Sequence, residues 1–489
     1  METNTKNSSN SADSGNGSSS PDNANKFGKR NRGQVNTNSA ADGLYLDTVI
    51  RNVLDFDFEP LCSVSLSPLN VYACLVCGKL FQGRGPSSHA YTHSLAVDHH
   101  IFINLASLKV YCLPESYEVK ESSLDDIKYV IRPFYKQDQI SKLDTASAYS
   151  YDLNNKSYLP GFVGLNNIKA NDYINVVVQA LAHVKPLRDF LLDDSFINVV
   201  DGIIGVGSTS KIQSKKKSSE LANRFATLVR KMWNTHAFKG QVSPHELLQE
   251  ISNASAKQFL LTIQADPADF LAWFLNVLHT GLGGSPKKNG GSVIHTSFQG
   301  QVRVESQAVA AAEGNHTSAV PVFDDKKETT TTTSPFLFLT LDLPAMPLFQ
   351  DELEKNIIPQ VPLSSLLEKY DGITEKEYTQ SIKRFRITKL PQFLIFHIKR
   401  FTKNNFTLEK NSTIVNFPIR GVDMREFIYQ NAPVFPDLDP TVEEEKTIYN
   451  LVANICHDSK PGAVEGTYKV HVHSKGRDQW LQIQDLIVE

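Results

Sequence analysis

The sequence predicts an α+β protein in which a small zinc-stabilised domain precedes a larger domain of helices followed by strands. Cysteines and histidines crowd together between residues 74 and 99. Apolar residues then recur at spacings of three and four as far as residue 279, which is typical of helices. Beyond residue 294 the pattern changes to short strands. Helices first and strands later favour α+β over a wound parallel sheet.

Length and composition limit the classes of protein to which this chain can belong. A chain of 489 residues is long enough for a sizeable core. Its 50 Lys+Arg against 53 Asp+Glu give a net charge of -3, so any RNA contact is expected to be indirect or minor. Five cysteines exclude a disulfide scaffold and favour a reduced, intracellular protein. No apolar run is long enough to span a membrane.

The chain divides by composition. Residues 1–43 are rich in Ser, Asn and Gly and are expected to form a disordered tail. A basic cluster in that tail is either a nuclear localisation signal or a solvated stretch; it contains Lys26, Lys29, Arg30 and Arg32. The predicted domains are a finger at 44–130, a helical connector at 131–157 and a larger domain at 158–489, with disordered insertions near 207–218 and 281–334.

The larger domain has a definite expected order of elements. Helices are predicted at 175–192, 219–234, 244–255 and 267–279. Strands are predicted at 295–304, 336–342, 393–401, 449–456 and 467–473.

One constellation predicts a metal site. Its spacing is C-x2-C-x15-H-x5-H, from Cys74, Cys77, His93 and His99. Two thiolates and two imidazoles form a closed tetrahedral set, which suits one structural Zn²⁺. Buried thiols with surface histidines are the alternative, but the histidines cluster too densely for it. A DNA-reading finger is rejected, because only Lys79 and Arg84 are basic between Cys77 and His93.

This region resembles the UBP-type zinc finger of the ubiquitin-specific proteases. The resemblance lies in residues 70–78 (NVYACLVCG), 83–85 (GRG) and 89–93 (HAYTH). It implies the same four zinc ligands. In members that grip a free ubiquitin tail, an arginine and a tryptophan contact the terminal carboxylate. Arg84 matches the arginine, whereas Tyr72 stands at the tryptophan position.

Many members of this finger family hold a second zinc. Cys62 and His89 match two of its ligands, but Ser65 and Gln82 stand where cysteines are expected. The resemblance therefore implies a single zinc in this chain. Cys112 is expected to be a packed thiol.

Residues 164–181 resemble the first catalytic box of the ubiquitin-specific proteases. There a cysteine at a helix N-terminus is activated by the helix dipole and by a histidine, beside an oxyanion asparagine. The resemblance places Asp172 at the nucleophile position and Asn167 at the oxyanion position. Thr467 replaces the histidine, and Gln484 takes the orienting position. The chain is therefore predicted to lack catalytic residues.

Asp172 is expected to cap the start of a helix, because an isolated carboxylate cannot perform this acyl transfer. Asp485 follows the orienting position as an acidic neighbour. His471 cannot replace the missing base, since it lies about 13 Å beyond residue 467 along a strand. Cys456 is expected to be a packed thiol.

Two further motifs extend the resemblance. Residues 269–271 (DFL) resemble a thumb helix, and residues 390–401 (LPQFLIFHIKRF) resemble a family strand. The implied fold is the papain-related arrangement of fingers, palm and thumb. No cysteine lies between Cys112 and Cys456, so the fingers are expected to be metal-free.

The combination of one finger and a degenerate protease domain resembles the spliceosome-associated, inactive members of this family. This implies a nuclear pre-mRNA splicing factor, a scaffold that contacts protein components of the spliceosomal tri-snRNP and supports its assembly or maintenance. An inactive reader that binds ubiquitin or a ubiquitin-like protein is the main alternative. An active cysteine deubiquitinase is a weaker one. Relatives usually continue beyond the final motif, so the C-terminal edge is expected to be incomplete.

Overall fold

The computed structural model describes most of the chain beyond residue 43. The described residues are 44–193, 196, 210–285, 291–308, 323, 328–345, 358–378, 381–403, 408–428, 447–459 and 465–489. The predicted tail, its basic cluster and parts of both predicted insertions lie outside them. No helix among these residues combines the length and apolar character that crossing a bilayer requires.

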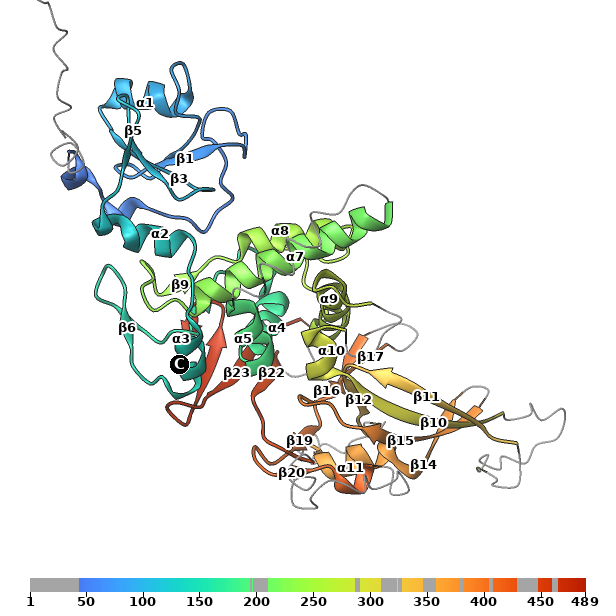
Figure 1. The fold of residues 1–489 in the computed structure, drawn as a ribbon. Helices are drawn as coiled ribbons and strands as arrows, with labels where there is room; N and C mark the ends of the chain where they lie inside the picture. Colours follow the sequence, from blue (N-terminus) through green and yellow to red (C-terminus); the bar gives the residue numbers. More distant parts are fainter. Residues whose placement is uncertain are drawn as a thin grey trace, which may run out of the picture. The chain divides into compact units, whose positions relative to one another are not determined.

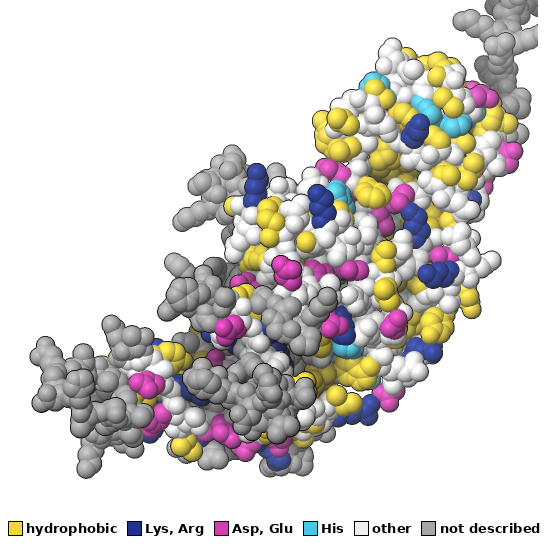
Figure 2. All heavy atoms as spheres, turned by 180° about the vertical axis from the view of Figure 1, so that it is seen from behind, with side chains coloured by type: hydrophobic (Ala, Val, Ile, Leu, Met, Phe, Trp, Pro, Cys, Tyr) yellow, Lys and Arg dark blue, Asp and Glu magenta, His cyan; other side chains and the backbone are white. Residues whose placement is uncertain are grey.

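The finger domain is an antiparallel sheet in the order β2-β1-β3-β4-β5, with helix α1 beside it (Figure 1). Its core is made by short strands whose side chains are almost all apolar, including Ala73, Ile101 and Ile103. Figure 2 shows histidine and hydrophobic side chains gathered on one face of this domain. The elements are β1 (Val71–Cys74), β2 (Leu80–Gln82), α1 (His89–Val97), β3 (Ile101–Asn104), β4 (Val110–Cys112) and β5 (Tyr117–Val119).

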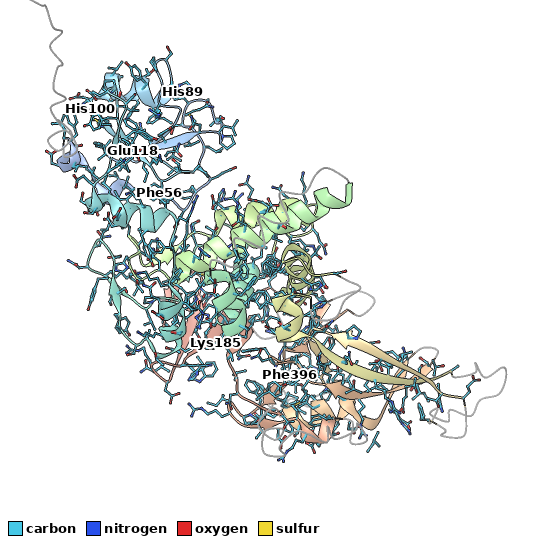
Figure 3. The ribbon with its side chains drawn as sticks, in the orientation of Figure 1. Phe56, His89, His100, Glu118, Lys185 and Phe396 are labelled. Atoms are coloured by element: carbon cyan, nitrogen blue, oxygen red, sulfur yellow. The ribbon has the colours of Figure 1, made fainter. Side chains whose placement is uncertain are left out.

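A short segment near the start of the finger domain contacts the helices of the larger domain. Phe56, labelled in Figure 3, packs against the finger core, which also includes Phe238 from the larger domain. The Lys231 ammonium donates to the Phe56 carbonyl at 2.7 Å and lies 3.1 Å from Asp57. Apolar packing and this partly buried ion pair therefore connect the two domains directly.

The thumb is a set of helices packed on the palm sheet. One continuous core includes both, because α4 lies against strands β22 and β23 while α7 packs on α8 and α9. The helices are α4 (Asp172–Ala182), α5 (Lys185–Leu192), α7 (Ser210–Met232), α8 (His245–Ala254), α9 (Pro267–Gly281) and α10 (Val293–Phe298). The palm sheet runs β22 (Ala453–Asp458), β23 (Thr467–Ser474), β24 (Gln479–Gln484) and β25 (Ile487–Val488).

The fingers of the larger domain form a second antiparallel sheet in the order β11-β10-β15-β14 (Figure 1). Beside it, β12 and β16 pair in parallel. A separate apolar core lies under these strands and includes Leu341 and Ile387. The strands are β10 (Gly300–Ala308), β11 (Thr330–Phe336), β12 (Leu339–Asp342), β14 (Asp371–Tyr378), β15 (Ser381–Lys389) and β16 (Phe396–Lys399).

Several predicted elements are confirmed, namely helices 244–255 and 267–279 and strand 467–473, each within two residues. The single predicted helix 175–192 is wrong, because the structure has two helices that meet at His183 and Val184.

Three other predictions on the larger domain are wrong in part. The insertion near 207–218 becomes helical from Ser210, where α7 begins. Residues 295–304 begin as helix α10 before the strand starts at Gly300. The threonine run at 329–333 lies in the insertion predicted near 281–334, but from Thr330 on it belongs to strand β11, which suits β-branched side chains that pair with β10.

The predicted helical connector is also mixed. It contains α3 (Gln137–Lys142), but a small hairpin of β6 (Ser150–Tyr151) and β7 (Ser157–Tyr158) follows. Predicted strands 336–342, 393–401 and 449–456 each divide in two. The first becomes the end of β11 followed by β12, and the second becomes β16 followed by β17 (Phe401–Lys403). The third becomes β21 (Ile448–Tyr449) followed by β22.

Candidate functional site

The finger brings its four predicted metal ligands together. Cys74 ends β1, Cys77 lies in the following turn, and the two histidines lie on α1 and just after it. Gly78 closes the turn with φ +73, and a Cβ there would lie 2.3 Å from the Val53 carbonyl oxygen, so only glycine fits. The ligand atoms of Cys74, Cys77, His93 and His99 all lie within 4.8 Å of one another.

The distances between these atoms suit a tetrahedral zinc ion. Sulfur-to-nitrogen distances are 3.5 Å from Cys74 to His99 and 3.4 Å from Cys77 to His93. The two ring nitrogens are 3.1 Å apart. Bonds of usual length at a tetrahedral Zn²⁺ give about 3.5 Å and about 3.3 Å for these edges. The residues present therefore fit the ion.

The electrostatics of the site also suit a cation. Burial raises the pKa of the Cys74 thiol to about 12, and Cys77 adds to this effect. A thiolate there needs a positive charge beside it, which a bound metal supplies. Burial, with His99 and Lys79, lowers the pKa of His93, which keeps the imidazole neutral for ligation. Phe81 stacks on His93 at 4.3 Å between ring centroids and fixes the ring.

Hydrogen bonds occupy the position where related fingers hold a second zinc. The Ser65 hydroxyl donates to the Gln82 side-chain oxygen at 2.9 Å, and the Gln82 amide donates to the Ser67 hydroxyl at 3.3 Å. The Ser65 N–H donates to the Cys62 sulfur at 3.4 Å. Among the described residues no potential metal cluster includes Cys62 or His89. Polar side chains thus link the residues of this loop to one another.

A cluster that the sequence did not predict lies in the same domain. His100, Cys112 and Glu115 place one ligand atom each within 4.8 Å of one another. Both ring nitrogens of His100 are already engaged, by the Leu113 carbonyl at 2.7 Å and by Asp98 at 2.9 Å. Burial raises the pKa of the Cys112 thiol to about 11. These contacts favour a packed thiol over a second metal site.

The two residues that the family resemblance aligns with the tail-binding positions, Arg84 and Tyr72, are arranged around a third aromatic ring. The Arg84 guanidinium lies 4.2 Å from the centroid of Tyr111, and Tyr72 meets Tyr111 edge-on at 6.1 Å. Tyr72 is buried in the finger core, with 5% of its surface exposed. Tyr111, which the sequence did not single out, therefore presents the aromatic surface beside the arginine.

Asp172 is a buried junction between three parts of the larger domain. It is 3% exposed, and one carboxylate oxygen accepts from the Gln264 amide at 2.7 Å and from the Tyr468 N–H at 3.0 Å. The Gln264 amide also donates to the Gly466 carbonyl at 3.0 Å. Asp172 begins α4, as expected of a residue at a helix N-terminus, but its carboxylate accepts from the loop before α9 and from β23 instead of capping its own helix.

The other predicted positions form a second group of hydrogen bonds. The Gln484 amide donates to the Thr467 hydroxyl at 3.2 Å, so both replacements lie side by side. The Asn167 amide donates to Asp485 at 3.0 Å, and Asn175 donates to the same carboxylate at 3.2 Å. The amide expected to stabilise an oxyanion is thus held by a carboxylate.

His471 serves a different part of the palm. Its Nδ1 atom lies 3.9 Å from the Cys456 sulfur, and its Nε2 atom lies 3.2 Å from the Gln482 side-chain oxygen. Burial raises the pKa of Cys456 despite nearby Lys469. The thiol is therefore held in its protonated form, and His471 does not replace a base beside Asp172.

Family models match both domains. Residues 163–489 match the ubiquitin carboxyl-terminal hydrolases, and residues 62–124 match the zinc finger found in ubiquitin hydrolases and other proteins. The chain belongs to the ubiquitin carboxyl-terminal hydrolase family. The two matches follow the predicted order of a finger domain and then a protease-like domain, and the observed α+β architecture agrees with the predicted fold class.

Several relatives in this hydrolase family are highly similar. The chain is 48% identical over 454 residues to human "Ubiquitin carboxyl-terminal hydrolase 39", covering 91% of this chain and 76% of that protein. It is 48% identical to "Probable mRNA-splicing protein ubp10" of Schizosaccharomyces pombe, covering 91% and 84%. The "Pre-mRNA-splicing factor SAD1" of Saccharomyces cerevisiae is 33% identical, with coverages of 76% and 75%.

A solved structure agrees with these relatives. The crystal structure of an essential yeast splicing factor matches with a TM-score of 0.67 and 28% identity, covering 91% of this chain and 94% of that one. The match extends over finger and hydrolase domain together.

Within the hydrolase fold, the Asp172 carboxylate acts as a hydrogen-bond acceptor. A carboxylate would need a paired carboxyl or a metal to act in hydrolysis. Among the described residues, both clusters that could hold a metal lie in the finger domain. The hydrogen bonds to Gln264 and Tyr468 instead tie the thumb to the palm.

Proposed function

We propose that this chain is a nuclear pre-mRNA splicing factor that acts as a scaffold for protein components of the spliceosomal tri-snRNP and does not cleave ubiquitin. The observation that carries the proposal is Asp172, a buried carboxylate that two donors hold where the family resemblance places the nucleophile. The splicing names of relatives at 48% and 33% identity support the assignment to splicing.

The loss of chemistry concerns three positions. Asp172 lacks the thiol, Thr467 lacks the base, and Gln484 donates its amide to Thr467 instead of orienting a histidine. Asn167 is retained, but its amide is engaged by Asp485. A protein with this centre retains the surfaces of a hydrolase and works by binding.

Zinc has a structural role in this proposal. One ion held by Cys74, Cys77, His93 and His99 would stabilise the finger, because a closed set of four protein ligands leaves no position for a substrate. The finger then presents its surfaces to other proteins as a rigid domain.

The splicing role is tested by purifying the tagged full-length chain from nuclear extract and identifying the proteins that accompany it. Proteins of the tri-snRNP are expected in the eluate, and an unrelated tagged nuclear protein controls for background. Their absence at low salt would exclude the scaffold role. Their presence together with ubiquitin cleavage by the eluted chain would exclude the inactive interpretation.

A second candidate, an inactive ubiquitin reader, is favoured by one observation. Arg84 lies over the Tyr111 ring and is available beside an aromatic surface, as tail recognition needs. Titrating ubiquitin into the full chain tests this, with Arg84→Ala as the matched variant. Binding that Arg84→Ala weakens at least tenfold would support the reader. No binding at high micromolar ubiquitin would end it.

A further inference from the structure

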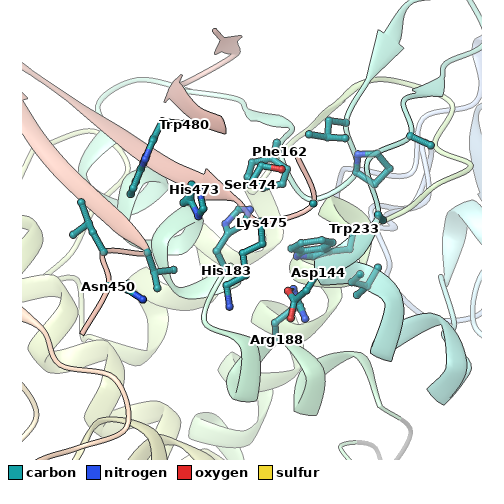
Figure 4. A pocket seen from close by; sticks show the side chains of 18 of the residues that line it. Asp144, Phe162, His183, Arg188, Trp233, Asn450, His473, Ser474, Lys475 and Trp480 are labelled. Carbon is teal, nitrogen blue, oxygen red and sulfur yellow. The ribbon is translucent and has the colours of Figure 1, made fainter. Parts of the chain in front are cut away.

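A cavity of about 520 Å³ lies away from Asp172 (Figure 4). Asp172 begins helix α4, whereas His183, which lines the cavity, follows the last residue of that helix. Eleven helical residues separate the two ends by about 16 Å. The cavity, which we name the α4–α5 pocket, is therefore distinct from the degenerate catalytic centre.

The floor of the α4–α5 pocket is aromatic. The His183 ring lies 4.6 Å from Phe162 and 5.4 Å from Trp233, measured between ring centroids. Burial lowers the pKa of His183 to about 4, so this ring is neutral, and its Nδ1–H donates to the Gln179 carbonyl at 2.7 Å. Trp480 lies on the opposite wall in Figure 4. The remaining walls are largely apolar and include Leu143, Leu159, Pro160, Ile419, Leu451 and Val452.

The charged lining of the α4–α5 pocket is mainly basic. Three cations, Arg188, Arg420 and Lys475, face a single carboxylate, Asp144. Arg188 is 2% exposed and neutralises Asp144 at 2.7 Å, so that pair adds no net charge.

The two other cations of the lining are exposed to solvent. Arg420 pairs with Asp478 at 2.6 Å, but both side chains are about two-thirds exposed, with values of 65% and 68%. A surface pair of this kind is weak and exchanges partners easily. Lys475 is exposed and has no ion pair among the described residues. Both cations can therefore meet a carboxylate that approaches from solvent.

We propose that the α4–α5 pocket binds a segment of a partner protein that inserts an aromatic or large aliphatic side chain and sets acidic residues against Lys475 and Arg420. The aromatic floor and apolar walls suit a single bulky anchor, which is the usual core of a protein interaction site. Asp478 offsets Arg420, so Lys475, which has no ion pair among the described residues, gives these exposed groups a net positive charge, which favours carboxylates on the same segment. This inference goes beyond the splicing role, because the pocket binds such a segment whatever particle the chain joins.

A synthetic peptide tests the proposal directly on the full chain. The probe is a dye-labelled seven-residue peptide with Phe-Leu at its centre and Asp or Glu on both sides. Saturable fluorescence polarisation is expected, with a Kd below about 1 mM. A peptide with Ser-Ser in place of Phe-Leu is expected to bind at least tenfold more weakly. Equal binding of the two peptides would overturn the anchor.

The charge component has its own matched pair of variants. Lys475→Glu is expected to weaken binding at least fivefold, whereas Lys389→Glu, at an exposed lysine on β15, is expected to change it less than twofold. Both residues are exposed, so folding is not at risk. Equal effects of the two variants, or tighter binding of a peptide with Lys in place of the acidic residues, would overturn the proposal.

Tryptophan fluorescence locates the bound peptide. The chain has three tryptophans, and two of them, Trp233 and Trp480, line the α4–α5 pocket. In Trp273→Phe only these two remain, and an unlabelled peptide is expected to change their emission at the concentrations that saturate polarisation. Saturation of polarisation without any change in emission would place the peptide elsewhere and refute the pocket.

Discussion

Replacing Asp172 by alanine tests whether this residue has become a structural link. The side chain is 3% exposed and accepts hydrogen bonds from Gln264 at 2.7 Å and from the Tyr468 N–H at 3.0 Å. Alanine removes both acceptors at once. The Tyr468 N–H then remains buried at the start of β23 with no acceptor in that position.

The expected loss follows from these two bonds. A buried N–H without a partner costs about 1–3 kcal/mol. The bond to Gln264 adds about 0.5–1.5 kcal/mol, nearer the low end because Gln264 is exposed and regains water. The second carboxylate oxygen is buried without a partner among the described residues, so its removal offsets part of this loss, and Asp172→Ala should lower the free energy of unfolding by about 2 kcal/mol. Asp172→Asn keeps one acceptor oxygen for both donors and should cost less.

Urea unfolding followed by tryptophan fluorescence measures this loss, and amide exchange at Tyr468 localises it. Asp138→Ala is the matched control, since Asp138 also lies in the first turn of a helix, α3, but is exposed. Its cost should stay below about 0.5 kcal/mol. If both variants lose the same small amount, Asp172 acts only through the helix dipole and the link between thumb and palm is refuted.

Three further predictions concern the metal, the lost chemistry and pH. Cys74→Ser should abolish binding of the single Zn²⁺ per chain and unfold the finger, whereas Cys112→Ser should keep the ion. Metal analysis after gel filtration distinguishes the two variants. A wild-type chain that contains no zinc but unfolds cooperatively would contradict the assignment. A ubiquitin-vinyl-sulfone probe should label no cysteine of the wild-type chain, and labelling detected by intact mass would revive an active hydrolase. His183 has a pKa of about 4 when folded, below the usual 6.5, because it is buried. The unfolded chain therefore binds the proton more readily, and stability should fall as pH drops from 6.5 towards 4, by up to about 3 kcal/mol from this residue. His183→Phe should flatten that decline, and an unchanged slope of unfolding free energy against pH would refute it.

Local spacing was enough to predict the candidate metal cluster of Cys74, Cys77, His93 and His99. The four ligands lie within one short stretch, and the sequence distances alone fix which side chains can meet at one ion. Helices 244–255 and 267–279 were equally predictable, since their apolar residues repeat with the helical period and pack on one core.

The partners of Asp172 could not be predicted, because they depend on distant parts of the chain. Gln264 lies 92 residues away and Tyr468 lies 296 residues away, in a loop and a strand whose approach only the tertiary fold determines. The α4–α5 pocket has the same origin, since its walls come from separate segments of the thumb, the connector and the palm. The threonine run was misjudged for another reason: its composition suggests a loop, but pairing with β10 supplies the strand with partners.

At two sites in this chain, hydrogen-bonded polar side chains stand where related proteins have a metal site or a catalytic nucleophile. In the finger, Ser65 and Gln82 hold by hydrogen bonds a loop that related fingers close with zinc. In the larger domain, Asp172 holds by hydrogen bonds the junction that a hydrolase keeps open for its nucleophile. A catalytic thiol must remain accessible to substrate, whereas a buried acceptor is most useful when both of its donors stay in place. The arrangement around Asp172 therefore favours rigidity over turnover, as a scaffold requires.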